Sequence, residues 1–390
     1  MRVPRLVLRN ARLFGGDGLE PEPADLVLDG GQVRERTAAG QGPRGDTEIE
    51  LEGRVVMPGL VNAHDHLDFS VFPPLGKPPY TSVYDWAAEI AGGTNDPEAQ
   101  AALAVPEVDR LFLGGVRNLL AGVTAVVHHG VFHRSLVRPD FPVRVQDRYQ
   151  FAHSPGLTPA LRKTYRSTDR RIPWFVHVAE GVDDRARAEV SALVEANVLR
   201  QNTVAVHAIA VGEDDARLMA EKEACVVWCP ESNRHLYGAT APFAVLRAAG
   251  VRVGLGSDSP VSGVRDALSN LAAARGEGVL EDFGLLRLAT HDSAVVARLP
   301  AGDTAPGGLP DLIVVDSVEA ILAGRRDAIA LVLREGRPLY GRPETLPAGT
   351  ALTVDGGERR LEASIARRLA SLVKRYPQIR RSPWLSTLAC

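Results

Sequence analysis

The sequence is poor in lysine and cysteine, and it contains no long apolar run. Only four of its 390 residues are lysines, although lysine and arginine together number 45, so nearly all basic side chains are arginines. Its three cysteines are in no paired metal spacing and predict a reducing compartment. No apolar run approaches the roughly 18 residues that a membrane span needs, and "MRVPRLVLRNARLF" has no signal-peptide core. These absences predict a cytoplasmic protein.

The charge balance is also ordinary. The formal net charge is -3, and charged residues make up 24% of the chain. This composition gives no reason to expect nucleic acid or an anionic membrane surface as a partner. The apolar fraction of 45% is that of a soluble globular protein, and the length allows a full-size core.

Two segments with short predicted strands flank a longer middle part. Residues 1–55 and 306–356 carry alternating apolar residues between clusters of Gly, Pro and Asp. In residues 56–305, strand-like runs alternate with stretches of helical spacing. Repeated strand–helix units over about 250 residues predict an α/β fold with a (β/α)8 TIM-like barrel. The flanking segments would form one small β-sandwich domain, followed by a C-terminal helical tail over residues 357–390.

An open, doubly wound parallel sheet is the alternative to the barrel. No G-x-G-x-x-G or P-loop pattern follows a predicted strand in this sequence. Because those loops are typical of nucleotide-binding doubly wound folds, their absence favours the barrel.

The stretch "VMPGLVNAHDHLDFS", residues 56–70, ends an apolar run with two histidines. Residues i and i+2 of a strand face the same side, so His64 and His66 would point one way and Asp65 the other. A strand end of this kind can present two imidazoles to one metal ion. The alternative is a polar turn that contains two histidines by chance.

Further polar residues stand at the ends of predicted strands, where a barrel collects its catalytic groups. "WFVHVAE" contains His177 and Glu180, "TVAVHAIA" contains His207, and "VRVGLGSDS" contains Asp258. A single histidine on an apolar strand is more often a hydrogen-bonded core residue, but several at successive strand ends predict a site. Imidazole and carboxylate ligands together suit zinc or ferrous iron.

In this order, "PGLVNAHDHLDFS", "HVAE", "VHAIA", "CPESN" and "GSDSPVSGVRDALSNL" resemble the amidohydrolase superfamily. They are most similar to its branch of mononuclear metal-dependent deaminases and chlorohydrolases, which includes cytosine, guanine and adenosine-type deaminases and triazine hydrolases. The resemblance covers most of the chain, including the split β domain. It implies a hydrolase of carbon–nitrogen bonds other than peptide bonds, acting on a small heterocyclic molecule.

The resemblance also implies a role for each matched residue. Glu180 would shuttle protons, His207 would contact the attacking water or the substrate, and Asp258 could also accept a proton. Relatives with two metals generally bridge them with a modified lysine on the fourth strand, and the candidate segment "FPVRVQDRYQFAHS" has no lysine. One divalent ion is therefore expected, zinc first and ferrous iron as the alternative. Its four ligands would be His64, His66, His177 and Asp258.

The substrate contacts are less closely defined. Ser232 and Asn233 match the family's Ser-Asn pair after strand 7, with hydrogen bonds that close the loop as the alternative role. Trp86 lies in a long loop rich in Pro and aromatic residues, where it would stack on a flat ring or pack the loop onto the barrel. The remaining candidates are three histidines at strand exits, namely His129, His133 and His153.

Three functions stay open on the sequence alone. The first is deamination of an amino-substituted nitrogen heterocycle, such as a nucleobase or nucleoside, by a metal-activated water. The second is hydrolysis of a cyclic amide or a halogenated triazine-type ring at the same site. The third is a catalytically silent scaffold on the same fold. The family resemblance also favours a homo-oligomer, commonly a dimer.

Overall fold

The chain was analysed as a computed structural model. The structure describes residues 4–14, 20–92, 96–382, 384–385 and 388–389. Parts of the predicted first and last segments lie outside these ranges, and so does Cys390, which the sequence places in the tail.

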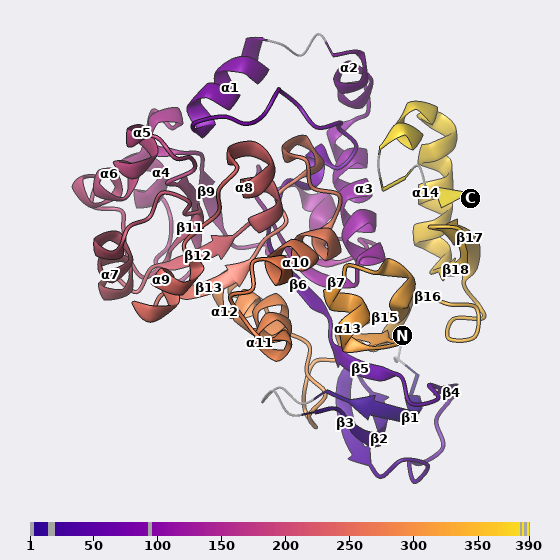
Figure 1. Ribbon diagram of the computed structural model, residues 1–390. Helices are drawn as coiled ribbons and strands as arrows, with labels where there is room; N and C mark the ends of the chain where they lie inside the picture. Colours follow the sequence, from indigo (N-terminus) through magenta and orange to yellow (C-terminus); the bar gives the residue numbers. More distant parts are fainter. Residues whose placement is uncertain (1–3, 15–19, 93–95, 383, 386–387, 390) are drawn as a thin grey trace.

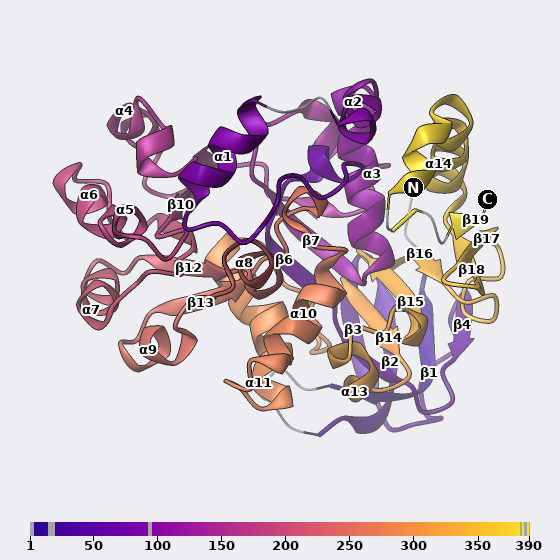
Figure 2. The same ribbon diagram turned by 45° about the horizontal axis from the view of Figure 1, so that its top comes forward.

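Segments from both ends of the chain form one large sheet (Figures 1 and 2). The central contact is antiparallel pairing of β5 with β14, in which Met57 lies opposite Ile313. The predicted domain boundaries stay a prediction. From the N-terminal side the sheet contains β1 (Leu6–Leu13), β2 (Glu22–Asp29), β3 (Gln32–Thr37), β4 (Thr47–Glu50) and β5 (Val55–Pro58). From the C-terminal side it contains β14 (Leu312–Val315), β15 (Ile329–Arg334), β16 (Arg337–Gly341), β17 (Thr350–Val354), β18 (Gly357–Leu361) and β19 (Leu388–Ala389).

The middle of the chain forms two parallel sheets. Their strands are buried almost throughout, as expected for parallel strands covered on both faces. The predicted α/β class is therefore confirmed. The first sheet contains β6 (Leu60–Asp65), β7 (Val123–His128) and β8 (Arg144–Val145). The second contains β9 (Gln150–Ala152), β10 (Trp174–Val178), β11 (Thr203–His207), β12 (Cys225–Trp228) and β13 (Arg252–Leu255).

The two parallel sheets are joined at one edge, between β6 and the residues after β13, and are not paired at the other, between β8 and β9. At the first, Asp65 and Asp258 form an isolated parallel bridge, and the Asp258 N–H donates to the His64 carbonyl at 2.9 Å. At the second, residues 146–149 connect β8 directly to β9 without a helix, and no pairing joins these two strands. The strand–helix alternation expected of a (β/α)8 barrel is thus interrupted there, because the sequence between the two strands is too short for a helical crossover.

The helices cover the outside of the parallel sheets (Figure 1). Among the described residues, none is both long and apolar enough to cross a membrane. The α-helices are α1 (Val83–Gly92), α2 (Pro97–Leu103), α3 (Glu107–Leu120), α4 (Leu161–Arg166), α5 (Asp184–Arg187), α6 (Glu189–Glu195), α7 (Glu213–Glu221), α8 (Pro230–Tyr237), α9 (Phe243–Ala248), α10 (Ala267–Gly276), α11 (Asp282–Arg287), α12 (Ser293–Ala297), α13 (Val318–Leu322) and α14 (Ala363–Arg375).

Two helices have particular positions. Residues Val296 and Ala297 of α12 join strand residues such as Ala63 and Val206 in one apolar cluster, so α12 packs against strands of both parallel sheets. Helix α14 lies beside α3 (Figure 2). The predicted C-terminal tail contains α14 but begins with β18, because that strand pairs with β17.

Candidate metal centre

Five histidine rings lie together where the parallel strands end. The His64 ring centroid is 5.0 Å from that of His66, 4.8 Å from His129, 5.2 Å from His177 and 5.7 Å from His207. All five residues are buried. They come from β6, β7, β10 and β11 or from the residue that follows the strand. Because parallel strands end at the same edge, residues far apart in sequence meet here.

A carboxylate completes this histidine cluster. The Asp258 Oδ1 atom lies 3.9 Å from His64 Nε2 and 3.7 Å from His66 Nε2. The ligand atoms of these three residues all lie within 4.8 Å of one another, and so do those of His64, His177 and His207. The first set combines two imidazoles with a carboxylate and the second has three imidazoles, and both kinds of group are ligands of divalent transition metals.

Unpaired buried nitrogens test whether a metal ion fits. Both ring nitrogens of His64 and the Nε2 atoms of His177 and His207 are buried without a hydrogen-bond partner in the described part of the chain. Buried polar atoms normally have partners, since leaving them unpaired costs free energy. A divalent ion beside Asp258 would supply a partner for one nitrogen each of His64 and His177, so the residues fit a divalent metal.

The protonation state of the histidines agrees with ligand chemistry. Burial, together with the neighbouring imidazoles, lowers the pKa values of His64, His66 and His177 well below the ordinary histidine value. These imidazoles are therefore neutral at pH 7, which is the form that binds a metal.

Glu180 lies beside this cluster. Its Oε2 atom is 3.3 Å from His177 Nδ1, and its Oε1 atom is 3.6 Å from His207 Nε2. The Tyr237 hydroxyl donates to Oε1 at 2.7 Å. Burial raises the pKa of Glu180, while His207 and the Tyr237 hydrogen bond lower it. Such a carboxyl group can hold a proton and release it to a neighbour.

Two residues of the cluster have unusual backbone conformations. His207 has φ of 75° and Asp258 has φ of 61°, although neither is glycine. Non-glycine residues seldom adopt the left-handed region, and those that do gather at functional sites. At these two positions the chain turns sharply after β11 and shortly after β13.

The predicted Ser-Asn pair lies behind the cluster. Asn233 Oδ1 accepts from His207 Nδ1 at 2.8 Å, and Asn233 Nδ2 donates to Thr240 Oγ1 at 3.3 Å. This hydrogen bond fixes the His207 ring through Nδ1, so that its Nε2 atom faces the cluster. Ser232 is buried, and its hydroxyl lies 3.4 Å from the Cys229 carbonyl.

The other predicted substrate contacts divide into two groups. His129 lies in the cluster, 4.4 Å from the His177 ring, and His153 lies at its exposed edge, 5.7 Å from that ring. His133 is apart from the cluster, because its exposed ring accepts from the Ser135 N–H and caps the short helix that follows. The Trp86 indole donates to the Leu75 carbonyl at 3.1 Å, so it packs the loop as the alternative proposed.

Three supporting residues were not found from the sequence. Arg117 NH2 donates to both oxygens of Asp65 at 2.7 Å, on the side of β6 away from His64. Glu189 accepts from the Ala179 N–H at 2.6 Å and from a tyrosine hydroxyl. The third residue is Tyr237, and the sequence did contain a signal for its position. Asn233 and Tyr237 are four residues apart in α8 and so share one helix face.

Comparison with known proteins finds relatives of this chain. Residues 161–341 match the amidohydrolase family. A 5-methylthioadenosine/S-adenosylhomocysteine deaminase of Natronomonas pharaonis is 26% identical over 418 residues, covering 92% of this chain and 96% of that protein. A protein of the same name from Syntrophobacter fumaroxidans is 28% identical, with coverages of 77% and 81%.

Solved structures share the fold of this chain at lower identity. A zinc-bound adenosine deaminase of Xanthomonas campestris superimposes with a TM-score of 0.75 at 17% identity, covering 96% of this chain and 98% of that chain. A triazine hydrolase of Arthrobacter aurescens superimposes with a TM-score of 0.74 at 17% identity, with coverages of 96% and 100%. The predicted resemblance to the metal-dependent deaminase and chlorohydrolase branch is confirmed.

Proposed function

We propose that this protein is a metal-dependent hydrolase that deaminates an amino-substituted nitrogen heterocycle. One observation carries the proposal, namely the convergence of four candidate ligands with Glu180 beside them. Glu180 Oε2 lies 3.3 Å from His177 Nδ1, close to the ligand set but free to move a proton. The names of the relatives agree with this chemistry. A silent scaffold would not need to keep this set together.

Each side chain has a distinct task in this reaction. When bound, a divalent ion lowers the pKa of a water molecule from 15.7 toward about 7. Glu180 would pass one proton of the water to the substrate ring nitrogen and the second to the amino group, which leaves as ammonia while the water oxygen stays on the ring carbon as a carbonyl. His207, fixed by Asn233, offers Nε2 to the water or substrate. The ligands of the ion would be His64, His66, His177 and Asp258.

We infer that the substrate is a purine nucleoside with an amino group. Adenosine derivatives appear in the names of the relatives that cover most of this chain and in that of a structural neighbour. His153 borders the cluster on its exposed side, 5.7 Å from the ring of the buried His129, where it could contact the base.

The same proposal includes features of the assembly and the ion. We propose that the two parallel sheets close into a TIM-like barrel, that the small β domain uses residues 1–55 and 306–356, and that the ion is a single zinc. The protein would act in the cytoplasm as a homodimer, with neither nucleic acid nor membrane as a partner.

Ammonia release by the purified, metal-assayed protein tests the function. The panel contains adenosine, 5-methylthioadenosine, S-adenosylhomocysteine, amino-pyrimidines, pterins and amino-triazines. We expect ammonia from at least one nucleoside and a loss of at least about a hundredfold in Glu180→Gln, because general acid–base groups contribute about 10²–10⁴-fold. Glu213→Gln, an exposed acid on α7, is the matched control and keeps full activity.

Hydrolysis of a halogenated triazine or a cyclic amide is the second candidate, because triazine hydrolases are among the structural neighbours. Chloride release or ring opening that is lost in Glu180→Gln would favour it over deamination. Silence on every compound by a protein that binds no metal would overturn both.

A further inference from the structure

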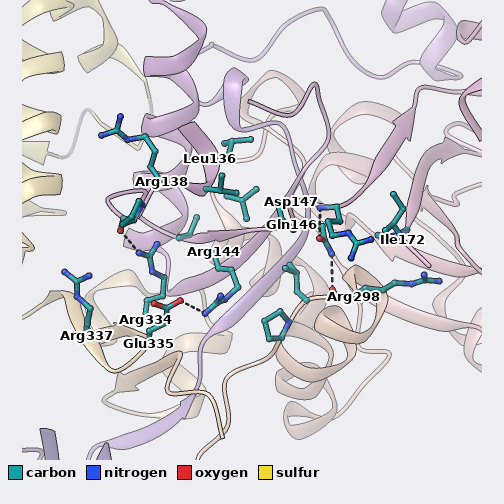
Figure 3. A pocket seen from close by; sticks show the side chains of 18 of the residues that line it. Leu136, Arg138, Arg144, Gln146, Asp147, Ile172, Arg298, Arg334, Glu335 and Arg337 are labelled. Atoms are coloured by element: carbon teal, nitrogen blue, oxygen red, sulfur yellow. Dashed lines mark hydrogen bonds and ion pairs between the residues drawn. The ribbon is translucent and has the colours of Figure 1, made fainter. Parts of the chain in front are cut away.

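A second cavity lies away from the histidine cluster (Figure 3). Its volume is about 610 Å³, which is within the range of small-molecule sites. Its wall includes Arg171, Ile172 and Pro173, which directly precede β10, whereas His177 lies near the end of that strand. Four residues of extended strand separate Pro173 from His177 by about 13 Å. The cavity is thus at the opposite end of β10 from the proposed active site.

The lining of this cavity is strongly basic. It contains seven arginines and two acidic residues, which are Asp147 and Glu335, a formal excess of five positive charges. The whole chain has a net charge of -3. A concentration of one sign in a concave wall raises the local potential and attracts ligands of the opposite sign.

Several of these arginines are already neutralised by carboxylates. Arg144 pairs with Asp311 at 3.2 Å and with Glu335 at 3.0 Å. Arg138 pairs with Asp140 at 2.9 Å. Arg171 pairs with Asp169 at 2.6 Å. These ion pairs account for part of the positive charge and hold three of the seven arginine side chains in place.

Four other arginines have no ion pair in the described part of the chain. Arg298 donates only to the carbonyls of Arg170 and Gln201, at 3.4 and 3.2 Å. Arg334 likewise donates only to backbone carbonyls, among them that of Pro139 at 2.9 Å. The remaining two are Arg148 and Arg337. Both are exposed, and their side chains make no hydrogen bond within the described part of the chain.

Burial makes part of this positive charge unfavourable. Desolvation lowers the pKa of Arg334. It also lowers the pKa of Arg298, which is less deeply buried. A lowered arginine pKa means that the cation lacks compensation in its surroundings. An anion in the cavity would supply that compensation, and guanidinium groups match phosphate oxygens in geometry.

The wall also has an apolar part. Ile172, Leu299 and Pro300 line it, and Figure 3 shows Ile172 and Arg298 on one side of the cavity with Arg138, Arg334 and Arg337 on the other. A single small anion would reach one side, whereas a chain of phosphates would reach both.

We propose that this cavity binds an oligophosphate, either free or as the phosphate chain of a nucleotide. The site is distinct from the histidine cluster and does not depend on the proposed deaminase activity. The cavity and the histidine cluster are connected through α12. Gln146, in the cavity wall, donates to the carbonyls of Ala297 and Arg298 at 2.8 and 3.0 Å. Ser293, at the start of α12, accepts from the Leu255 N–H at 2.7 Å.

Isothermal titration of the full-length protein tests the proposal. Sodium tripolyphosphate, ATP and inorganic phosphate are titrated separately at low and at physiological salt. We expect one tripolyphosphate per chain, with an affinity that falls as salt rises. Tighter binding of ATP would support a nucleotide whose base lies on the apolar part, and equal binding would support a free oligophosphate.

The variant is Arg148→Gln combined with Arg337→Gln, since neither exposed side chain holds the fold together. We expect tripolyphosphate affinity to fall by at least about tenfold, the effect of two lost charge–phosphate contacts. Arg187→Gln combined with Arg217→Gln removes the same charge from α5 and α7 and should leave the affinity within about twofold. No binding of tripolyphosphate at millimolar concentration, or an equal loss in both double variants, would overturn the site.

Discussion

At the scale of single residues, Tyr237 decides how Glu180 is held. Its hydroxyl donates to Glu180 Oε1 at 2.7 Å, and both groups are buried. Hydrogen bonds to charged groups contribute about 1.5–3 kcal/mol. We therefore expect Tyr237→Phe to lower kcat by about tenfold to a hundredfold, because a free carboxyl group would spend less time in the reactive position. Steady-state kinetics on the substrate found in the ammonia assay measures this effect.

The control for that variant is Tyr80→Phe. Tyr80 also donates to a carboxylate, Glu89, at 2.7 Å, but Tyr80 is half-exposed in the loop that follows His66 and Glu89 is exposed on α1. Its removal should leave kcat within about twofold. A Tyr237→Phe enzyme with unchanged kcat would show that Glu180 is held by other contacts.

The Asp65–Arg117 pair is a second residue-scale feature, and it concerns stability. Arg117 is 1% exposed and its NH2 donates to both Asp65 oxygens at 2.7 Å. Removing one partner of a buried ion pair costs about 3–5 kcal/mol, because the other charge stays buried. We expect Arg117→Gln to lower the free energy of unfolding in urea by this amount. Arg187→Gln, at an exposed pair on α5, should change it by less than about 1 kcal/mol.

At the scale of elements, the loop that follows His66 is fastened to the segment that carries Glu180. The Val83 N–H donates to the Glu180 carbonyl at 3.0 Å, and Ser82 pairs with Gly181. Glu189 of α6 joins both, since it accepts from the Ala179 N–H and from the Tyr84 hydroxyl. The loop therefore positions the segment that carries Glu180.

This arrangement predicts a pH dependence of stability. Burial raises the pKa of Glu189 to about 7, against an ordinary value of 4.5. Between about pH 4.5 and 7 the folded state holds a proton that the unfolded state has lost. The free energy of unfolding therefore falls as pH rises through this window, by about 3 kcal/mol from this group.

Glu189→Gln removes that contribution. We expect urea unfolding to give a smaller decrease between pH 4.5 and 7 in the variant than in the wild type, and the variant to gain relative stability as pH rises. Glu195→Gln, an exposed acid on the same helix, should keep the wild-type slope. Parallel curves for the wild type and Glu189→Gln would contradict the assignment.

The helices and strands also show which parts of the fold and of the candidate site could be predicted from the sequence. Alternating and continuous apolar runs predicted the strands, and period-2 geometry predicted that His64 and His66 face one way while Asp65 faces the other. The break between β8 and β9 was missed, because "FPVRVQDRYQFAHS" has the composition of one continuous strand. Contacts such as Tyr237 with Glu180 depend on how α8 docks, which local patterns do not encode. His133 was named from its position after a strand, but its ring serves as a helix cap.

At the scale of the whole molecule, the candidate ligands lie on both sides of the contact between the two parallel sheets. His64 and His66 belong to the three-stranded sheet, whereas His177 and Asp258 belong to the five-stranded one or the residues just after it. Along their shared seam, the strands are linked by the Asp65–Asp258 bridge and the hydrogen bond from Asp258 to His64. A bound ion would therefore cross-link the two parallel sheets.

Metal removal should therefore destabilise the contact between the two parallel sheets. A ligand present at a hundred times its Kd stabilises the folded state by about 2.7 kcal/mol, so chelation should lower the thermal midpoint by about 3 °C. Hydrogen exchange should rise in residues 60–65 and 252–258, on the two sides of the seam, and much less in the large mixed sheet. Asp258→Asn should abolish most of the difference between metal-loaded and chelated protein, whereas the exposed Glu213→Gln should keep it. A chelator effect spread evenly over the chain would mean that the ion does not act at the seam, since only a local cross-link confines the change to strands β6 and β13.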